Sequence, residues 1–246
     1  LRESYGRIGQ RDPTRHVIHF WRPPGENSPE IIEVFSPDMP FLVDSVLGAI
    51  RAKGGAIRLM AHPVLPLDPE SHRVLEGFDT PGAMRESMLH VHIDPLPTAE
   101  ARAEMQREID EVLEAVKVAV AGWRPMLERL RRVVADLEAR QLRGVQQTEM
   151  TEAVQFLRWL ADHNFTFLGM REYAVARGAG ASSLAPVPGS GLGILANPDV
   201  RFLRAGSSWV EMTPQHAAFL ADPDPLLVTK ANVRARVHRR AHMDYV

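Results

Sequence analysis

Hydrophobic positions in the first half of the chain follow two different spacings. Short stretches that are apolar, or that alternate apolar with polar residues, predict strands, whereas apolar residues repeated every three or four positions predict helices. The expected strands cover 16–21, 30–35, 57–67 and 88–94, with a short hairpin at 72–78, and the expected helices cover 42–53 and a longer stretch that begins after Thr98. The polar residues 1–15 are expected to form a loose arm. This order of strands and helices predicts an α+β sandwich.

The long helix is expected to break at Gly122–Pro125, because proline removes a helical hydrogen bond. A second helix follows with an apolar stripe from Leu127 to Leu137, and the stretch 143–148 has no apolar period. This pattern predicts a first domain at 1–121, a helical connector at 122–147 and a second domain at 148–246.

The second domain is expected to be a small, mostly antiparallel sheet entered by one helix. That helix runs from about Thr151 to Asn164, and a loop rich in Ala, Gly, Ser and Pro occupies 176–190. The expected strands cover 165–175, 192–195, 200–203, 209–212 and 226–240, the last with Ala231, Val233, Ala235 and Val237 on one face.

Composition changes this picture little. The 246 residues are 45% hydrophobic and 24% charged with a net charge of −2, which is typical of soluble globular proteins and gives no reason to expect a nucleic-acid or membrane partner. No run of about 18 apolar residues predicts a membrane span. The absence of cysteine excludes disulfides and thiol chemistry and favours a cytoplasmic location. The first residue, Leu1, and the apolar last residues suggest a piece of a larger protein.

Two histidines, His90 and His92, lie two positions apart on an expected strand, so both side chains face one way. Asp94 continues that row, and His62 lies on another strand. A metal site would need further ligands that the sequence does not fix, and a solvent-facing row of polar residues gives the same pattern. We therefore expect solvated histidines and no metal.

The segment Gly189–Gly193, with glycine at alternate positions, resembles half of a dinucleotide-binding fingerprint. That motif needs a strand before it and a helix after it, whereas here a strand is expected to follow. A glycine-rich turn is the better interpretation. No nucleophile elbow and no Walker loop is present in the sequence, so we expect no catalytic residue in this chain and no cofactor bound to it.

The expected strand at 226–240 carries a strongly basic face. Such a face could bind an anion or an acidic partner, or it could be a solvated edge strand whose cations discourage aggregation. We leave both interpretations open. The residues of this face are Lys230, Arg234, Arg236, His238 and Arg240.

A turn at Asp38–Met39–Pro40–Phe41 leads from a strand into a helix, with Asp38 as the expected helix N-cap. A strand that ends in Asp-x-Pro before a helix resembles the start of ACT domains, in which this turn and the helix N-terminus take the charged groups of an amino acid. If an effector binds, the resemblance implies Asp38, Met39, Pro40, Phe41, Asp44 and Ser45. Many ligand-binding ACT domains have glycine where this chain has Phe41, and a side chain there would obstruct the approach of a ligand. The closing strand after the second helix is also missing, and we expect the strand at 16–21 to replace it.

Several longer strings of residues, taken together in this order, resemble the N-terminal region of the large bacterial NAD-specific glutamate dehydrogenases. They occupy 38–46, 61–65, 86–94, 156–162, 164–169, 171–173, 190–195 and 229–232. The resemblance implies an ACT-like (ferredoxin-like) domain, a helical connector and a PAS-like domain that serve regulation and assembly. It also implies a parent enzyme that uses NAD, with its catalytic residues outside this chain. The implied partners are other domains of the same chain, further copies of it in a homo-oligomer and an amino-acid effector. The rival interpretation is a purely structural oligomerisation module.

Overall fold

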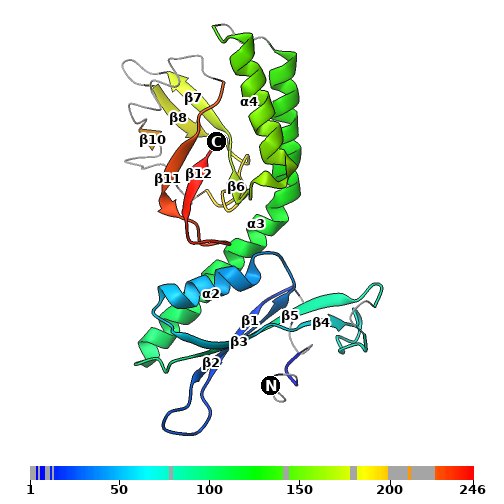
Figure 1. Ribbon diagram of the computed structural model, residues 1–246, viewed down its shortest axis with the longest axis vertical. Helices are drawn as coiled ribbons and strands as arrows, with labels where there is room; N and C mark the ends of the chain where they lie inside the picture. The colour runs from blue at the N-terminus through cyan, green and yellow to red at the C-terminus, as the bar shows by residue number, and fades with distance from the viewer. Residues whose placement is uncertain are drawn as a thin grey trace. The chain divides into compact units, whose positions relative to one another are not determined.

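The computed structural model describes Ser4, residues 6–8, Asp12, and the ranges 14–77, 80–140, 144–177, 182–198, 210–211 and 225–246. The chain divides into two compact units (Figure 1). The first comprises Leu1–Lys117 and Arg236–Arg240, and the second comprises Val118–Ala235 and Ala241–Val246. A short segment from late in the sequence therefore belongs to the first unit. The domain limits expected from the sequence stay a prediction. Within the described part of the chain, no helix has the length and apolar character needed to cross a membrane.

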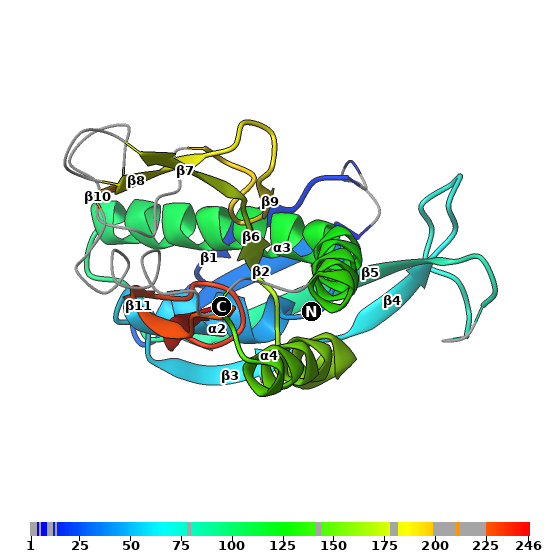
Figure 2. The same cartoon turned by 90° about the horizontal axis from the view of Figure 1, so that it is seen from above.

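The first unit is built on a five-stranded antiparallel sheet. Its strand order is β1-β2-β5-β3, and β4 pairs with the remaining part of β5. The long strand β5 thus pairs with three others, and its end with β4 extends beyond the rest of the sheet (Figures 1 and 2). The strands are β1 (Val17–Trp21), β2 (Glu30–Pro37), β3 (Ile57–Ala61), β4 (Val64–Leu67) and β5 (Met84–Ile93).

Strand β1 occupies the sheet edge next to β2, with Val17 opposite Phe35 and Trp21 opposite Ile31. In a β-α-β-β-α-β fold this is the place of the closing strand. The N-terminal strand therefore replaces it, as the sequence predicts. The predicted α+β class and the ACT-like arrangement are confirmed.

Helix α2 (Leu42–Ala52) and the first part of α3 (Ala99–Ala139) supply apolar side chains to the core of the first unit. On the sheet, Ile32 lies opposite Val91 and Val34 opposite Leu89, and all four are at most 1% exposed. The buried helix residues are Leu42, Val46 and Ile50 from α2 and Met105, Ile109 and Val112 from α3. These residues recur at spacings of three and four, which is why each helix turns one apolar side inward.

Three predictions for the chain up to the end of α3 are wrong. The strand expected at 57–67 is two strands, β3 and β4, separated at Pro63, which has no N–H to give to a sheet. The arm expected to be loose at 1–15 is packed at two of its described residues, because Ser4 is 1% exposed and Ile8 packs beside Phe35 and Met88. The break at Gly122–Pro125 does not occur, because α3 continues through Pro125. Buried residues on both sides of that proline, such as Val116 and Met126, hold the helix in one piece.

The second unit contains the C-terminal part of α3, helix α4 (Gln147–Trp159) and several small sheets. Leu127, Leu130 and Val134 of α3 pack with Val154 and Leu157 of α4. Helix α4 begins earlier than expected because Glu149 accepts a hydrogen bond from the Gln146 N–H at 3.0 Å. It ends in a π-turn, η1 (Leu160–Asn164).

The small sheets of the second unit are two- or three-stranded and antiparallel. They pair β6 with β9, β7 with β8 and β10, and β11 with β12. Their bounds are β6 (Gly169–Met170), β7 (Tyr173–Arg177), β8 (Ser182–Pro186), β9 (Leu192–Gly193), β10 (Val210–Glu211), β11 (Thr229–Arg234) and β12 (His242–Tyr245). The PAS-like assignment of this part stays a prediction.

The strands predicted for the second unit are corrected in detail. The strand expected at 165–175 forms only in β6 and β7, and part of the loop expected at 176–190 is strand β8. The strand expected at 226–240 ends at Arg234, and the chain turns at 235–241 into β12. Val233 is 41% exposed, so it does not share the buried face with Ala231. The strand expected at 200–203 lies outside the described residues.

Candidate functional site

The turn before α2 is where the sequence places an effector. The N-cap residue of α2 is Phe41, whose backbone has φ 69° and ψ −1° and whose side chain makes no capping hydrogen bond. The prediction that Asp38 is the N-cap is therefore wrong. Its N–H donates to the Arg85 carbonyl at 2.9 Å, and its carboxylate lies 3.6 Å from Arg85 Nε.

The other residues of this predicted site lie together but differ in exposure. Pro40 and Asp44 are exposed, Met39 and Phe41 are partly buried, and Ser45 is buried. A positive φ is a conformation that glycine adopts freely and a bulky residue adopts at a cost. Phe41 therefore holds a glycine-like backbone conformation while its ring fills the space that glycine would leave open.

A segment distant in sequence, residues 236–240, contacts this turn. The His238 N–H donates to Ser45 Oγ at 2.9 Å, and the His238 ring meets the Phe41 ring edge-on with centroids 5.0 Å apart. The nearest oxygen of Asp44 lies 4.0 Å from His238 Nε2. The structure thus joins two predicted sets of residues, the effector turn and the basic face, which the sequence treats as separate.

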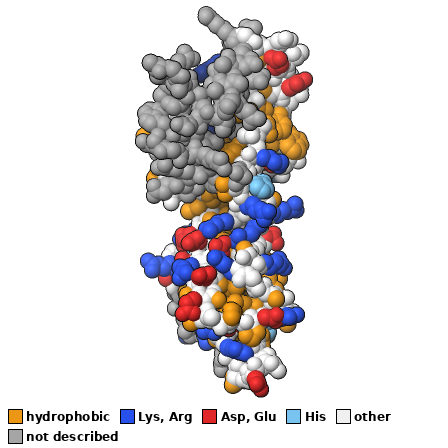
Figure 3. All heavy atoms as spheres, turned by 90° about the vertical axis from the view of Figure 1, so that its left-hand side faces the viewer, with side chains coloured by type: hydrophobic (Ala, Val, Ile, Leu, Met, Phe, Trp, Pro, Cys, Tyr) orange, Lys and Arg blue, Asp and Glu red, His pale blue; other side chains and the backbone are white. Residues whose placement is uncertain are grey.

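The predicted basic residues have carboxylate neighbours within the same chain. Arg236 contacts Glu111 at 2.5 Å and Glu108 at 3.4 Å, and Arg240 also pairs with Glu108. Lys230 pairs with Asp244 at 2.8 Å, while Arg234 is exposed. Only Lys230 and Arg234 of the five lie on the strand, because Arg236, His238 and Arg240 belong to the turn between β11 and β12. Basic and acidic side chains accordingly lie next to one another in Figure 3.

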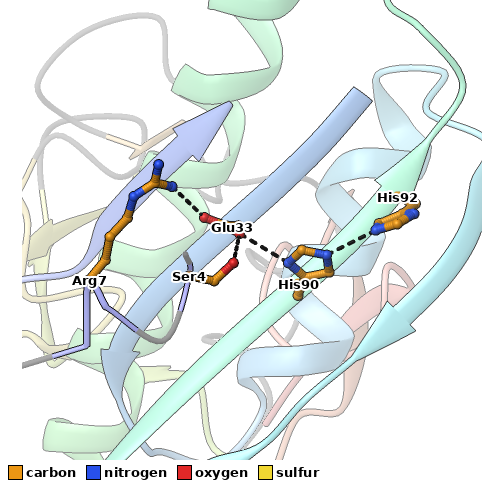
Figure 4. Close-up of polar contacts among 5 residues, drawn as sticks. All are labelled: Ser4, Arg7, Glu33, His90 and His92. Carbon is orange, nitrogen blue, oxygen red and sulfur yellow. Dashed lines mark hydrogen bonds and ion pairs between the residues drawn. The ribbon is translucent and has the colours of Figure 1, made fainter. Parts of the chain in front are cut away.

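The histidine pair belongs to a buried polar cluster on the sheet face that carries Ile31, Glu33 and Phe35. Glu33 of β2 lies opposite His90 of β5, and both are almost fully buried. His90 Nδ1 lies 3.1 Å from Glu33 Oε1, and His90 Nε2 lies 2.9 Å from His92 Nε2 (Figure 4). Because a carboxylate only accepts, His90 donates from Nδ1 and accepts from His92 at Nε2. The prediction of solvated histidines is therefore wrong for His90.

Glu33 and its partners from the N-terminal segment are not predicted from the sequence. Ser4 Oγ donates to Glu33 Oε1, and Arg7 Nη1 contacts Glu33 Oε2 at 2.9 Å (Figure 4). Burial raises the pKa of Glu33, but the hydrogen bond from Ser4, the Trp21 side chain and the adjacent His90 together outweigh it and leave the pKa below its usual value. Burial lowers the pKa of His90, against the opposing effect of Glu33. Glu33 is thus held as a carboxylate and His90 as a neutral imidazole.

The other two residues considered for a metal each have a partner away from the histidine pair. Asp94 forms an ion pair with Arg58 at 2.7 Å, and His62 Nε2 lies 2.6 Å from Ser87 Oγ. Across the described ranges, no three His, Asp or Glu side chains are grouped so that they could hold a metal ion. Ser87 beside His62 is the arrangement closest to a nucleophile with its base, but Ser87 is 0% exposed and out of reach of a substrate.

The glycine-rich segment Gly189–Gly193 is a tight turn that leads into β9, as predicted, and not a dinucleotide loop followed by a helix. Ser190 Oγ donates to the Val187 carbonyl at 2.7 Å. Gly193 has φ 59°, and a Cβ on Gly122 of α3 would lie 2.6 Å from the Gly193 nitrogen. Backbone packing therefore explains Gly122 and Gly193, and also Gly191, whose added Cβ would lie 2.1 Å from the Leu195 carbonyl oxygen.

Comparison with known proteins identifies the first unit. Residues 2–109 match the model of the family described as "Glutamate dehydrogenase, ACT1 domain". The chain is 30% identical over 250 residues to the NAD-specific glutamate dehydrogenase of Halomonas elongata, covering 97% of this chain and 15% of that protein. It is 32% identical over 235 residues to the NAD-specific glutamate dehydrogenase of Pseudomonas aeruginosa, covering 93% of this chain and 14% of that protein. The chain thus spans about one-seventh of the length of these relatives. Residues 2–109 thus match the ACT1 domain of glutamate dehydrogenases, and the chain is similar over most of its length to part of the NAD-specific enzymes.

Proposed function

We propose that this chain is a regulatory and assembly segment of an NAD-specific glutamate dehydrogenase and carries out no catalytic step itself. The parent enzyme would oxidise L-glutamate with NAD and water to 2-oxoglutarate, ammonia and NADH. The observation that carries this proposal is the match of residues 2–109 to the ACT1 domain, within a chain that spans 14–15% of its relatives. The glycine-rich turn at Gly189–Gly193 does not fit a dinucleotide, so NAD would bind elsewhere in the longer protein.

The regulatory ligand of the first unit would be an amino acid bound at the start of α2. Free N–H groups and the positive end of the helix dipole attract a carboxylate there, and the Phe41 side chain makes no capping hydrogen bond at this end of α2. Asp44 and Ser45 supply acceptors for an α-ammonium group within the same helical turn. Both charged ends of an amino acid therefore have a complementary group in the segment Asp38–Ser45.

Isothermal titration calorimetry of the 246-residue chain with each of the common L-amino acids tests this binding. We expect one or a few of them to bind, and Asp44→Ala to weaken that binding about tenfold through loss of a charge-assisted contact. Lys53→Ala, at the other end of the same helix, is the matched control and should bind as the unaltered chain does. Flat titrations with every amino acid would refute the effector part of the proposal.

The alternative is a purely structural module that assembles copies of the chain and binds no small ligand. The contact of Phe41 and Ser45 with His238 favours it, because the chain itself occupies part of the predicted effector site. Light scattering distinguishes the two functions when combined with the calorimetry. A stable oligomer that binds no amino acid would support the structural module alone.

A further inference from the structure

The amino-terminal end of α2 is covered by the chain's own residues 236–240. Ser45 is 1% exposed, and its hydroxyl accepts the His238 N–H at 2.9 Å. An α-ammonium at this position would compete for that same hydroxyl and for the Asp44 carboxylate, which lies 4.0 Å from His238 Nε2. The groups that an amino acid would use are therefore already in contact with this segment.

Backbone strain marks both sides of this contact. Phe41 has φ 69° and His238 has φ 65°, and neither is glycine. Residues other than glycine keep such a conformation only where the surrounding structure requires it. Here the two strained residues meet each other through their rings, 5.0 Å apart at an interplanar angle of 74°. Two of the four non-glycine residues with positive φ in the described ranges thus meet at this one contact.

Two residues of α3 anchor the segment from the opposite side. The Glu108 side chain is 9% exposed and lies between the guanidinium groups of Arg236 and Arg240. Arg236 also contacts Glu111, and Val237 between these arginines is 2% exposed. A buried carboxylate shared by two cations binds more strongly than an exposed ion pair does. Glu108 is therefore the main attachment point of the segment.

We propose that residues 236–240 form a latch, held by Glu108, that closes the amino-terminal end of α2 until it is released. The latch itself needs no ligand. Only the identity of what enters after release rests on the proposed function, as an amino acid that competes with His238 for Ser45. Release would be favoured by anything that weakens the two ion pairs at Glu108, including a rise in salt concentration.

A single engineered thiol can test the latch, because the chain has no cysteine. Ser45→Cys places the thiol under the latch, and Ser87→Cys places one at an equally buried position, 0% exposed, elsewhere in the same sheet domain. The rate of alkylation by iodoacetamide measures how often each position opens to solvent. Each thiol is combined with Glu108→Gln, which removes both ion pairs, or with Glu104→Gln, an exposed acid on the same helix, as the matched control.

Under the proposal, Glu108→Gln accelerates alkylation of Ser45→Cys about tenfold, while Glu104→Gln leaves it unchanged. Neither change affects Ser87→Cys. If Glu108→Gln unfolds the domain and also accelerates Ser87→Cys, Arg236→Gln replaces it, because it weakens the latch from its exposed side. The latch would be overturned if Ser45→Cys were alkylated at the same rate in all these backgrounds. It would also be overturned if Ser45→Cys, without a second substitution, were alkylated as fast as a free thiol. If calorimetry detects no amino-acid binding but the alkylation rates change as expected, the amino-acid effector is refuted and the latch is supported.

Discussion

The two faces of the central sheet in the first unit are both buried, but by different chemistry. One face carries Ile32 and Val91, and its apolar side chains pack among apolar side chains. The other face carries Glu33 and His90, whose polar atoms are paired with each other and with Ser4 and Arg7. The apolar face gains stability from area removed from water, whereas the polar face depends on every buried group finding its partner. The two faces should therefore respond differently to mutation and to pH.

The largest effect is expected from a cavity in the apolar face. Ile32→Ala removes most of a side chain that is 0% exposed, and should lower the free energy of unfolding by about 3–4 kcal/mol. Denaturation by urea measures this loss. His19→Ala, on the partly buried edge strand β1, is the comparison and should cost much less. A loss below about 1 kcal/mol for Ile32→Ala would mean that this face is not closely packed.

A smaller effect is expected when the polar face loses its charge but keeps its shape. Glu33→Gln weakens the contacts to Arg7 and His90, and should cost about 2 kcal/mol, the range for hydrogen bonds to charged groups. The same urea titration measures it, with Glu26→Gln in an exposed loop as the control. If both substitutions cost the same, Glu33 is not the centre of the cluster.

The smallest effect is a pH dependence, to which the polar face contributes His90 and Glu33. Burial lowers the pKa of His90 and of His62 below their ordinary value of 6.5. As the pH falls through 6.5, the unfolded chain therefore takes up protons before the folded chain does, and stability falls, by up to about 1.4 kcal/mol per pH unit for each histidine. Above this range the contribution is fully present. The lowered pKa of Glu33 adds a further loss below its ordinary value of 4.5.

Urea titrations at several pH values check this dependence. His90→Gln should flatten the curve in part, because His62 still titrates, while Ile32→Ala should shift the whole curve down without changing its slope. If His90→Gln leaves the slope of stability against pH unchanged, the pH dependence arises outside the cluster of Glu33 and His90.

The same contrast explains what could be predicted from the sequence. Local spacing is enough to place β2, α2 and β5, and the apolar face follows from their buried positions. The alternation of apolar and polar residues predicts one solvent-exposed face, and this prediction fails at His90 because Ser4, Arg7 and Ile8 cover that face from elsewhere in the chain. The strand expected across 226–240 fails for a related reason, since the turn at 235–241 is held by Ser45 and Glu108, which are far away in sequence. Long-range contacts of this kind leave no periodic signal.

The candidate site, too, could be predicted from the sequence only in part. Phe41 at a position that favours glycine is visible in the sequence, and its positive φ agrees with that reading. The residues that cover it, including His238, could be noticed only as a basic run. The charges of that run left open an external anion, an acidic partner or a solvated edge strand, whereas the structure pairs Arg236 and Arg240 with Glu108 of the same chain.

The proposal that this chain regulates but does not catalyse is tested most directly by the chain alone. The purified 246-residue protein is given L-glutamate and NAD, and formation of NADH is followed by absorbance beside the full-length enzyme of Pseudomonas aeruginosa. We predict no NADH from this chain under conditions in which the full-length enzyme turns over. NADH formation that stays with the chain through size-exclusion chromatography, and that Glu33→Gln abolishes, would contradict the account and place chemistry within these residues.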